Sequence, residues 1–426
     1  MTKFERIKNR GYIYQSTDDE ALPKLLDSKL TFYAGFDPTA DSLHVGHLLP
    51  IMLIRELVKM GHQAIILIGG GTALIGDPSG KKEARKMLDE NTVKNNAAAI
   101  RQQLINLVSD NDSSPIFIDN SDWLCQMKMI YYLRELGSKF SINKMLSAES
   151  VKQRLETGIS YLEFSYMILQ AYDFLKLYED YNCTLQIGGQ DQWGNIVAGT
   201  DIIRRFKSIQ AYGITVPLLL TPTGEKFGKT ANGTVWLSSS KTSDFDYYQF
   251  WRNVPDSECK KMLSLFTELP DDEIEELSKL QAPQLNRTKE ILAFECTKIA
   301  RGFDSASKAY LAAGAKFGFA DPEGTIKTSS SIITVNNKHN TKNLIPSVKI
   351  NLQGDENEIW VIRLFTESGL CSSSSEARRL IHGGGAYLNG EKITDINAKI
   401  PLNDLKNKEI IVAAGKKNFK RLIFNN

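Results

Sequence analysis

The spacing of apolar residues changes along the first third of the chain and predicts a βαβ unit. Around residues 30–36, apolar side chains alternate with others, as is typical of a β-strand. Asp37-Pro38-Thr39 ends this strand, because proline fixes φ and cannot extend a ladder. A helical period follows from about Leu43 to Met60, and Gly61 stops it. Residues 64–68 then predict a buried parallel strand.

The start of the predicted helix carries two histidines. Asp41 and Ser42 are good N-cap residues there, and His44 and His47 follow on one helix face. Gly46 between them leaves room for a flat ligand. In a βαβ unit this helix end lies at the carboxyl edge of the sheet, where open α/β folds bind nucleotides. The pair is equally consistent with surface or capping histidines, and two ligands do not make a metal site.

Glycine-rich turns follow two predicted strands. The turn at 68–82 has neither the dinucleotide-binding nor the Walker spacing. Lys81 and Arg85 suit a polyphosphate, and they suit a solvated helix face better on these residues alone. Residues 188–195 form the second such turn.

A lysine-rich loop lies further along the chain. Lys226 and Lys229 straddle a glycine within residues 223–230. The loop is either a polar surface turn or a mobile clamp on phosphate, where lysine acts as a point charge.

A long predicted helix at 159–178 has one polar stripe. Tyr166, Gln170 and Asp173 lie at positions i, i+4 and i+7 and therefore share a face, while most other positions are apolar. Buried polar groups need partners, and solvent-facing stripes usually carry Lys and Glu. We therefore favour a ligand pocket over a solvated face. The remaining elements expected before residue 242 are an amphipathic helical start at 1–30, helices at 90–110 and 122–157, and strands at 116–118, 184–187 and 215–220.

The last third of the chain differs in composition. Residues 244–316 have a helical pattern throughout, 321–347 are rich in Thr, Ser, Asn and Lys and predict a linker, and 358–426 predict a small α+β unit with a hairpin at 387–390. From Val361 onward, eleven Lys and Arg against six Asp and Glu give +5, which leaves −3 for the rest of a chain whose net charge is +2. A compact basic unit behind a linker suggests a nucleic-acid module. The candidate nucleic-acid-contacting cluster is Arg378, Arg379, Lys416, Lys417, Lys420 and Arg421.

Composition narrows the class of protein. The chain has 426 residues, of which 42% are hydrophobic and 24% charged, which is typical of a globular protein of two to four domains. No apolar run predicts a membrane span, and the basic N-terminus has no apolar signal region, so we expect a cytoplasmic protein. An organellar address stays open, since a presequence could have been removed. The five scattered cysteines predict free thiols and no zinc site.

Several motifs together resemble the bacterial-type tyrosyl-tRNA synthetases of class I. Residues 38–47 resemble the "HIGH" signature of that class, and 226–230 resemble its "KMSKS" loop. Residues 33–39, 76–80, 188–195 and the Tyr166/Gln170/Asp173 stripe resemble the tyrosine-specific family. The resemblance runs from about residue 4 to the end. Ala34, Gln190 and Pro50 depart from what close relatives usually carry.

The resemblance implies a role for each matching residue. Tyrosine would be bound by Tyr33, Asp77, Tyr166, Gln170, Asp173 and Gln192. The adenosine part of ATP would be bound by Gly35, Asp37, Gly189 and Asp191. The reacting phosphates would meet Thr39, His44, His47, Lys81, Arg85, Lys226, Lys229 and Thr230.

The resemblance also implies an architecture. It would be a Rossmann-like parallel sheet catalytic domain (1–225), a mobile loop and connection (226–241), an all-α domain (242–320), a linker (321–352) and a small α+β RNA-binding domain (353–426). The substrates would be L-tyrosine, ATP with Mg²⁺ and tRNA(Tyr), with no tightly bound protein metal, and the chain would form a homodimer. Two rivals stay open: the sister tryptophanyl synthetases, and an RNA-binding or regulatory protein without the chemistry.

Overall fold

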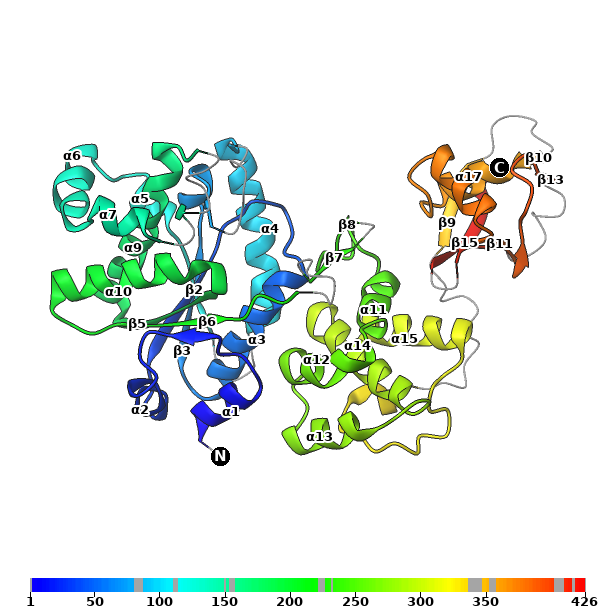
Figure 1. Cartoon of the computed structure of the whole chain (residues 1–426), viewed down its shortest axis with the longest axis horizontal. Coiled ribbons are helices and arrows are strands. Elements are labelled where there is room, and N and C mark those ends of the chain that lie inside the picture. The colour runs from blue at the N-terminus through cyan, green and yellow to red at the C-terminus, as the bar shows by residue number, and fades with distance from the viewer. Residues whose placement is uncertain are drawn as a thin grey trace.

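The computed structural model shows a mixed α/β region, a helical region and a small C-terminal unit with strands (Figure 1). It describes residues 2–79, 87–109, 114–148, 151–152, 158–220, 227–230, 233–335, 347–351, 358–401, 410–415 and 418–425. Among these residues, no helix combines the length and apolar character needed to cross a membrane.

A six-stranded sheet forms the centre of the α/β region. Its strand order is β1-β6-β5-β2-β3-β4, and all neighbours are parallel except β1, which pairs antiparallel with β6. The strands are β1 (Gln15–Ser16), β2 (Thr31–Phe36), β3 (Gln63–Ile68), β4 (Ile116–Asp119), β5 (Cys183–Gly189) and β6 (Tyr212–Val216). The chain builds outward from β2 to β4 and then returns to β5, so β2 and β5 meet where the strand order reverses.

Helices cover both faces of this sheet. The helices of this region are α1 (Lys3–Asn9), α2 (Ala21–Asp27), α3 (Val45–Lys59), α4 (Glu90–Val108), α5 (Ser121–Leu124), α6 (Met129–Tyr131), α7 (Ile142–Leu146), α9 (Tyr161–Tyr181) and α10 (Trp193–Lys207). Alternate residues of β2 face opposite cores: Phe32 and Ala34 pack with α3, whereas Tyr33 packs with α9. This alternation places the Tyr33 side chain on the α9 side of the sheet.

Four local predictions in this region need correction. The N-terminal segment is not helical throughout, since β1 adds to the sheet edge through two backbone pairs too short to leave a periodic signal. The N-cap of α3 is His44, not Asp41 or Ser42, because the imidazole itself accepts the Gly46 N–H. Residues 122–148 form several short helical turns and not one long helix. Residues 149–150 and 153–157 of the predicted helix lie outside the described residues. The last strand ends at Val216, before Pro217, which has no N–H for a ladder.

The helical region follows as the pattern predicted. It contains α11 (Asp244–Arg252), α12 (Cys259–Phe266), α13 (Asp271–Lys279), α14 (Leu285–Arg301) and α15 (Phe303–Phe317). Their buried side chains join the same hydrophobic core as α3.

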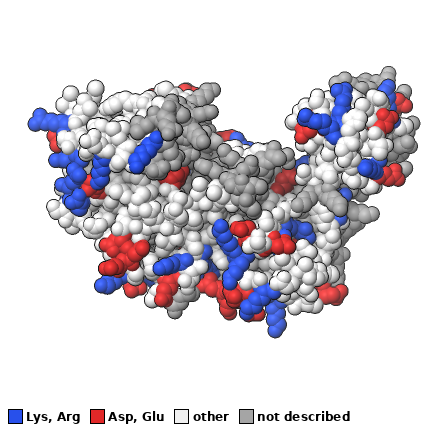
Figure 2. Space-filling model, in the orientation of Figure 1, with Lys and Arg blue, Asp and Glu red and all other residues white. Residues whose placement is uncertain are grey.

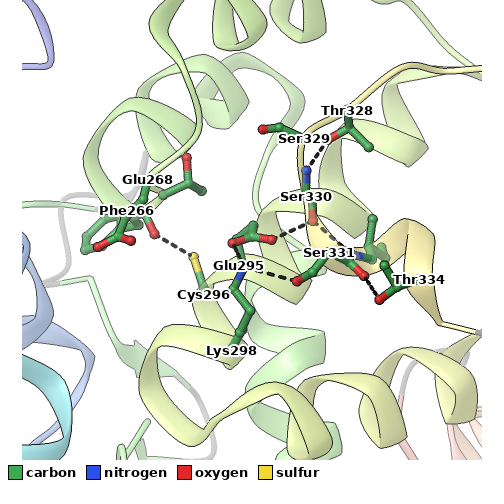
Figure 3. A network of polar contacts seen from close by, with 12 residues as sticks. Phe266, Glu268, Glu295, Cys296, Lys298, Thr328, Ser329, Ser330, Ser331 and Thr334 are labelled. Atoms are coloured by element: carbon green, nitrogen blue, oxygen red, sulfur yellow. Dashed lines mark hydrogen bonds and ion pairs between the residues drawn. The ribbon is translucent and has the colours of Figure 1, made fainter. Parts of the chain in front are cut away.

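Residues 321–335, predicted as part of a linker, instead pack on α13 and α14. The Ser330 hydroxyl donates to the buried Glu295 carboxylate at 2.6 Å, and Lys298 reaches the Ser331 hydroxyl at 3.1 Å (Figure 3). Glu273 accepts from the Thr328 hydroxyl at 2.6 Å. The Ser- and Thr-rich composition predicted a solvated linker. Serine and threonine hydroxyls can, however, donate to buried carboxylates as readily as to water, so the same composition suits a packed segment. Residues 347–351, also predicted as linker, form β9 (Ser347–Asn351), which pairs with the last strand of the C-terminal unit. The remaining linker residues, 336–346 and 352, lie outside the described residues.

The C-terminal unit is α+β, as predicted. Helices α16 (Val361–Glu367) and α17 (Ser374–His382) accompany β9 (Ser347–Asn351), β10 (Glu358–Trp360), β11 (Ala386–Leu388), β12 (Glu391–Lys392), β13 (Lys399–Pro401), β14 (Ile410–Ala414) and β15 (Asn418–Asn425). The predicted hairpin is confirmed, because Asn389 and Gly390 both have positive φ between paired β11 and β12.

Candidate active site

The candidate site lies at the carboxyl ends of β2 and β5, where the strand order reverses. In open α/β sheets this is the crevice in which ligands bind. The ends of β2, β3 and β4 and the helices α9 and α10 contribute three polar clusters, and α3 contributes a pair of histidines.

The first cluster surrounds the buried Asp173 of α9. Its carboxylate accepts from Trp123 Nε1 at 2.7 Å and from Asn120 Nδ2 at 2.9 Å. Tyr33 lies nearby, and its buried hydroxyl has no hydrogen-bond partner among the described residues. Burial raises the pKa of Asp173 to about 8, although the Asn120 and Trp123 bonds act in the opposite direction. Burial and the Asp173 charge raise the pKa of the Tyr33 phenol as well. The Tyr33/Asp173 cluster is therefore a buried polar spot beside the apolar core of α9.

The second cluster joins α9 to the end of β2. The Tyr166 hydroxyl donates to Asp37 Oδ2 at 2.7 Å, and the Thr72 hydroxyl donates to Asp37 Oδ1 at 2.7 Å. Asn120 donates to Thr72 Oγ1 at 3.0 Å, which links this cluster to the first. Tyr166 is buried, and burial together with Asp37 raises its pKa well above the usual value.

The third cluster lies toward α10. Gln192 Nε2 donates to Asp77 Oδ2 at 2.7 Å. Asn195 Nδ2 donates to Gln170 Oε1 at 3.1 Å and to Gln192 Oε1 at 3.1 Å. Asp77 also accepts from the Ser79 N–H at 2.9 Å. The structure thus brings Asp77, Gln170 and Gln192 together from three separate elements.

The two histidines stack at the N-terminus of α3. Their ring centroids lie 3.9 Å apart, His44 Nδ1 accepts from the Gly46 N–H, and His47 Nδ1 accepts from the His44 N–H. Each Nδ1 is therefore an acceptor, so Nε2 carries the proton of a neutral ring. Burial and the neighbouring His44 lower the pKa of His47. A Cβ at Gly46 would lie 2.8 Å from the His44 ring, so the lack of a side chain at this position makes room for the histidine.

The lysine-rich loop meets this helix end through its backbone. β7 (Lys229–Thr230) pairs with β8 (Gly233–Thr234), and Val235 then bonds both ways: its N–H donates to the Gly228 carbonyl, and its carbonyl accepts from the Val45 N–H. Gly228 has a φ of +87°, and a Cβ there would lie 3.3 Å from Val45 Cβ. Lys81, Arg85 and Lys226 and the side chains of Lys229 and Thr230 lie outside the described residues.

The other predicted nucleotide contacts lie in or shortly after β2 and β5. Gly35 and Thr39 are exposed just before and after Asp37, and the Thr39 N–H donates to the Asp37 carbonyl at 2.8 Å. A Cβ at Gly189 would lie 2.7 Å from Asp191 Oδ1. Asp191 is exposed and lines a cavity of about 550 Å³ with Gln190, Trp193 and Leu218.

The glycine-rich turn after β3 has a steric explanation. A Cβ at Gly69 would lie 1.9 Å from Asp37 Oδ1, and one at Gly70 would lie 2.3 Å from Asp119 Oδ1. The glycines therefore allow two carboxylates to approach the backbone at the sheet edge.

Sequence reasoning missed four polar side chains of the site: Thr72, Asn120, Trp123 and Asn195. Asn120 could have been found, because it directly follows β4 and must lie at the same sheet edge as Asp37. No local signal distinguishes Trp123 from an ordinary buried tryptophan.

The candidate nucleic-acid-contacting cluster is only partly described. Arg378 stacks on Trp360 with its guanidinium carbon 5.5 Å from the ring centroid, Arg379 is exposed, and Lys416 and Lys417 lie outside the described residues. Lys420 lies 3.2 Å from Asp246 of α11, so it holds the C-terminal unit to the helical region. Arg421 is half-buried in β15. On the face drawn in Figure 2, basic and acidic side chains are interspersed over this unit.

Comparison with known proteins gives the family. Residues 26–318 match the family described as tRNA synthetases class I (W and Y), and residues 338–422 match a tyrosine–tRNA ligase C-terminal domain. A tyrosine–tRNA ligase of Clostridium tetani is 44% identical over 421 residues, covering 99% of this chain and 98% of the relative. The chain belongs to the class I tyrosyl-tRNA synthetases.

Other relatives of this synthetase agree. A tyrosine–tRNA ligase of Desulfatibacillum aliphaticivorans is 46% identical over 428 residues, covering 100% of this chain and 99% of the relative. A C-terminally truncated mitochondrial tyrosyl-tRNA synthetase of Coccidioides posadasii aligns with a TM-score of 0.64 at 32% identity, covering 73% of this chain and 91% of that one. The corresponding structure from Aspergillus nidulans has a TM-score of 0.65 at 29% identity, covering 73% and 92%.

Proposed function

We infer that this synthetase binds L-tyrosine in the crevice between β2 and β5 and activates it there with ATP. The chain is a tyrosine–tRNA ligase that makes tyrosyl-adenylate and then charges tRNA. The observation that supports the site is the meeting of three features at one sheet edge: the buried Tyr33/Asp173 spot, the stacked histidines of α3, and the backbone of the lysine-rich loop.

The tyrosine ring would enter beside Asp173, where the unpartnered Tyr33 hydroxyl and the Asp173 carboxylate would bond the substrate hydroxyl. Asp77, Tyr166 and Gln170 would hold the ammonium group, and Gln192 the region of the carboxylate. Because Asp37 already accepts from Tyr166, the same hydrogen-bonded chain would connect the tyrosine site to the ribose site. The remaining proposed ATP contacts are Gly35, Asp37, Thr39, His44, His47, Lys81, Arg85, Gly189, Asp191, Lys226, Lys229 and Thr230.

The chemistry needs no nucleophilic side chain. The tyrosine carboxylate attacks the α-phosphorus of ATP, which enters with Mg²⁺ as substrate, and pyrophosphate leaves with the electron pair of the broken P–O bond. A terminal ribose hydroxyl of tRNA then attacks the activated carbonyl, and AMP leaves. Donors aimed at charge that grows in the transition state supply the catalysis. Neutral imidazoles with protonated Nε2 suit that task.

Exchange of labelled pyrophosphate into ATP, without tRNA, tests this proposal. We expect exchange with tyrosine and none with tryptophan, and we expect His44→Ala to slow adenylation far more than it weakens tyrosine binding. Equal loss of both would remove His44 from the reacting phosphates. Exchange with tryptophan alone would favour the sister family, to which a tryptophan-bound structure from Encephalitozoon cuniculi, at a TM-score of 0.54 and 12% identity, gives a likeness of fold alone.

Exchange with neither amino acid would favour the RNA-binding or regulatory alternative.

The proposed division of labour assigns 1–225 to catalysis, 226–241 to the mobile loop and its connection, 242–320 to the tRNA stem, 321–352 to a linker that the packing of 321–335 shortens, and 353–426 to RNA binding. The proposed tRNA-contacting residues are Arg378, Arg379, Lys416, Lys417, Lys420 and Arg421. We place the protein in the cytoplasm.

A homodimer is part of the same proposal. Large apolar side chains are exposed on neighbouring elements of the α/β region: Met129, Ile130, Ile142 and Tyr161 are between 58% and 74% exposed. Patches of this kind mark interaction sites. A second copy of this chain is the occupant that the family implies.

A further inference from the structure

The segment 235–238, which follows the lysine-rich loop and β8, is hydrogen-bonded to the start of the histidine helix α3. Trp236 and His44 form an antiparallel bridge, and their rings lie 6.2 Å apart edge to face. The bridge consists of two backbone bonds, from the Val45 N–H to the Val235 carbonyl at 3.0 Å and from the Leu237 N–H to the Leu43 carbonyl at 2.8 Å. One further bond, from the Ser238 N–H to Ser42 Oγ at 3.2 Å, extends the contact. The position of His44 therefore depends on where this segment lies.

Arg301, the last residue of α14, holds the same segment from the other side. Its Nε donates to the Leu237 carbonyl at 3.1 Å, and one terminal nitrogen donates to the Trp236 carbonyl at 3.0 Å and reaches the Ser238 carbonyl at 3.5 Å. The other terminal nitrogen donates to Asp244 at 2.8 Å. The guanidinium thus joins three consecutive carbonyls of this segment to the helical region.

The surroundings of Arg301 hold its side chain in this position. The side chain is 4% exposed, and its guanidinium carbon lies 4.3 Å from the centroid of the Tyr247 ring. A flat fork of donors can satisfy several carbonyls at fixed angles, whereas the compact ammonium of lysine cannot. A buried carbonyl without a hydrogen-bond donor costs free energy. The position of segment 235–238 therefore depends on the position of the Arg301 guanidinium.

We propose that Arg301 is a positioning residue for adenylation: it sets segment 235–238, and through it the imidazole of His44. The proposal rests on the proposed role of His44 at the reacting phosphates. Arg301 itself touches neither substrate. It acts from the helical region, 64 residues beyond Leu237 in sequence, and so couples the placement of that region to the chemistry.

Arg301→Lys tests this, with Arg287→Lys as the matched control. Arg287 is on the same helix, is also 4% exposed, and bonds Glu290 and Tyr310 instead of segment 235–238. We expect Arg301→Lys to slow single-turnover adenylate formation by about 10- to 100-fold, the range that a small misplacement of reacting groups produces. The tyrosine dissociation constant should change less than about twofold, because no bond of Arg301 reaches the Tyr33/Asp173 spot.

Arg287→Lys should lower the thermal midpoint of unfolding about as much as Arg301→Lys does. Its rate of adenylate formation should stay within about twofold of the wild-type rate. A merely structural role for Arg301 would give the two variants the same kinetics, and that result would overturn the proposal.

A double mutant separates this proposal from the function on which it rests. If Arg301 acts through His44, adding Arg301→Lys to His44→Ala should cause little further loss of rate. Multiplying losses would show that Arg301 does not act through His44 and would overturn the proposal. If His44→Ala alone leaves adenylation intact, the proposed role of His44 fails, whatever Arg301 does.

Discussion

At the scale of the residue, the site is organised by buried groups that the fold leaves partly unsatisfied. Asp173 has two donors, Asn120 and Trp123, whereas the Tyr33 hydroxyl beside it has no partner in the described part of the chain. A phenol would complete this arrangement, and a phenylalanine ring would leave it incomplete at about 1–3 kcal/mol for each unpaired group. Rejection of phenylalanine by about 10⁵-fold is an established property of tyrosyl-tRNA synthetases and not a value obtained from this geometry.

Asp173→Ala should therefore lower discrimination between tyrosine and phenylalanine. We expect a loss of at least about tenfold in the ratio of kcat/KM values, which pyrophosphate exchange with each amino acid measures. Asp201→Ala is the control, since Asp201 pairs with Arg204 and Arg205 of its own helix and with Lys144 of α7. Unchanged selectivity in Asp173→Ala would remove this residue from the tyrosine pocket.

The raised pKa of Asp173 predicts a pH dependence of stability. In the native state the pKa is about 8, against an ordinary value of 3.8, so between these values the native carboxyl keeps a proton that the unfolded chain has lost. The contribution of this group to the free energy of unfolding is full below about pH 4 and falls as the pH rises toward 8. Urea unfolding of the tyrosine-free protein and of Asp173→Asn, between pH 5 and 8, should show the wild type losing stability relative to the variant. A gain instead would contradict the buried, protonated carboxyl.

At the scale of the element, two short segments far apart in sequence act as one unit. The Gly228 carbonyl of the lysine-rich loop accepts from the Val235 N–H, and the Val235 carbonyl accepts from the Val45 N–H in the first turn of α3. Phe227 anchors the loop, because its ring lies 5.0 Å from that of Phe250 and 5.6 Å from that of Trp251 in the helical region. The loop therefore has one end fixed against the histidines while its lysines lie on either side of the fixed glycine.

Gly228→Ala should disturb this unit specifically. The φ of +87° strains any L-residue, and the added Cβ would lie 3.3 Å from Val45 at the start of α3. We expect slower adenylate formation with nearly unchanged tyrosine affinity, measured by stopped flow and equilibrium titration. Gly233→Ala is a matched control, because its φ of +98° gives similar strain in open space. Equal effects of the two variants would mean that backbone strain, and not contact with α3, is responsible.

At the scale of the whole molecule, the α/β and helical regions share one hydrophobic core, and specific contacts add to it. Arg301 joins the helical region to the site, and Phe419 of β15 packs 5.0 Å from Phe245 and 5.5 Å from Phe317, ring centroid to ring centroid. The opposite end of the α/β region, at α6 and α7 in Figure 1, carries the exposed apolar patch. Assembly at that patch would leave the contacts between regions intact.

Ile130→Asp should therefore weaken self-association without unfolding the chain. Ile130 is 71% exposed, so a charge there costs little in a monomer and much in a buried interface. Sedimentation over a range of concentrations should show a higher monomer fraction than in the wild type. Ile209→Asp, at a residue 41% exposed and distant in sequence from that patch, is the control. The same association state in Ile130→Asp and the wild type would place the dimer interface elsewhere.

Local sequence determined most of the elements and the order in which they occur. Alternation, proline and glycine predicted β2, α3 and β3, the long α9 and the C-terminal hairpin, because these signals act within a few residues. Motif resemblance then supplied the family, which the full-length relatives confirm.

Tertiary structure alone decided which polar groups meet. Tyr166 and Asp37 are 129 residues apart, Trp123 and Asp173 are 50 apart, and Arg301 reaches the carbonyl of Trp236 across 65. A hydrogen bond depends on distance and angle in space, and neither follows from the period of one element. Local sequence therefore determined the chemistry available at the sheet edge, whereas packing decided which groups are satisfied and which remain for a ligand.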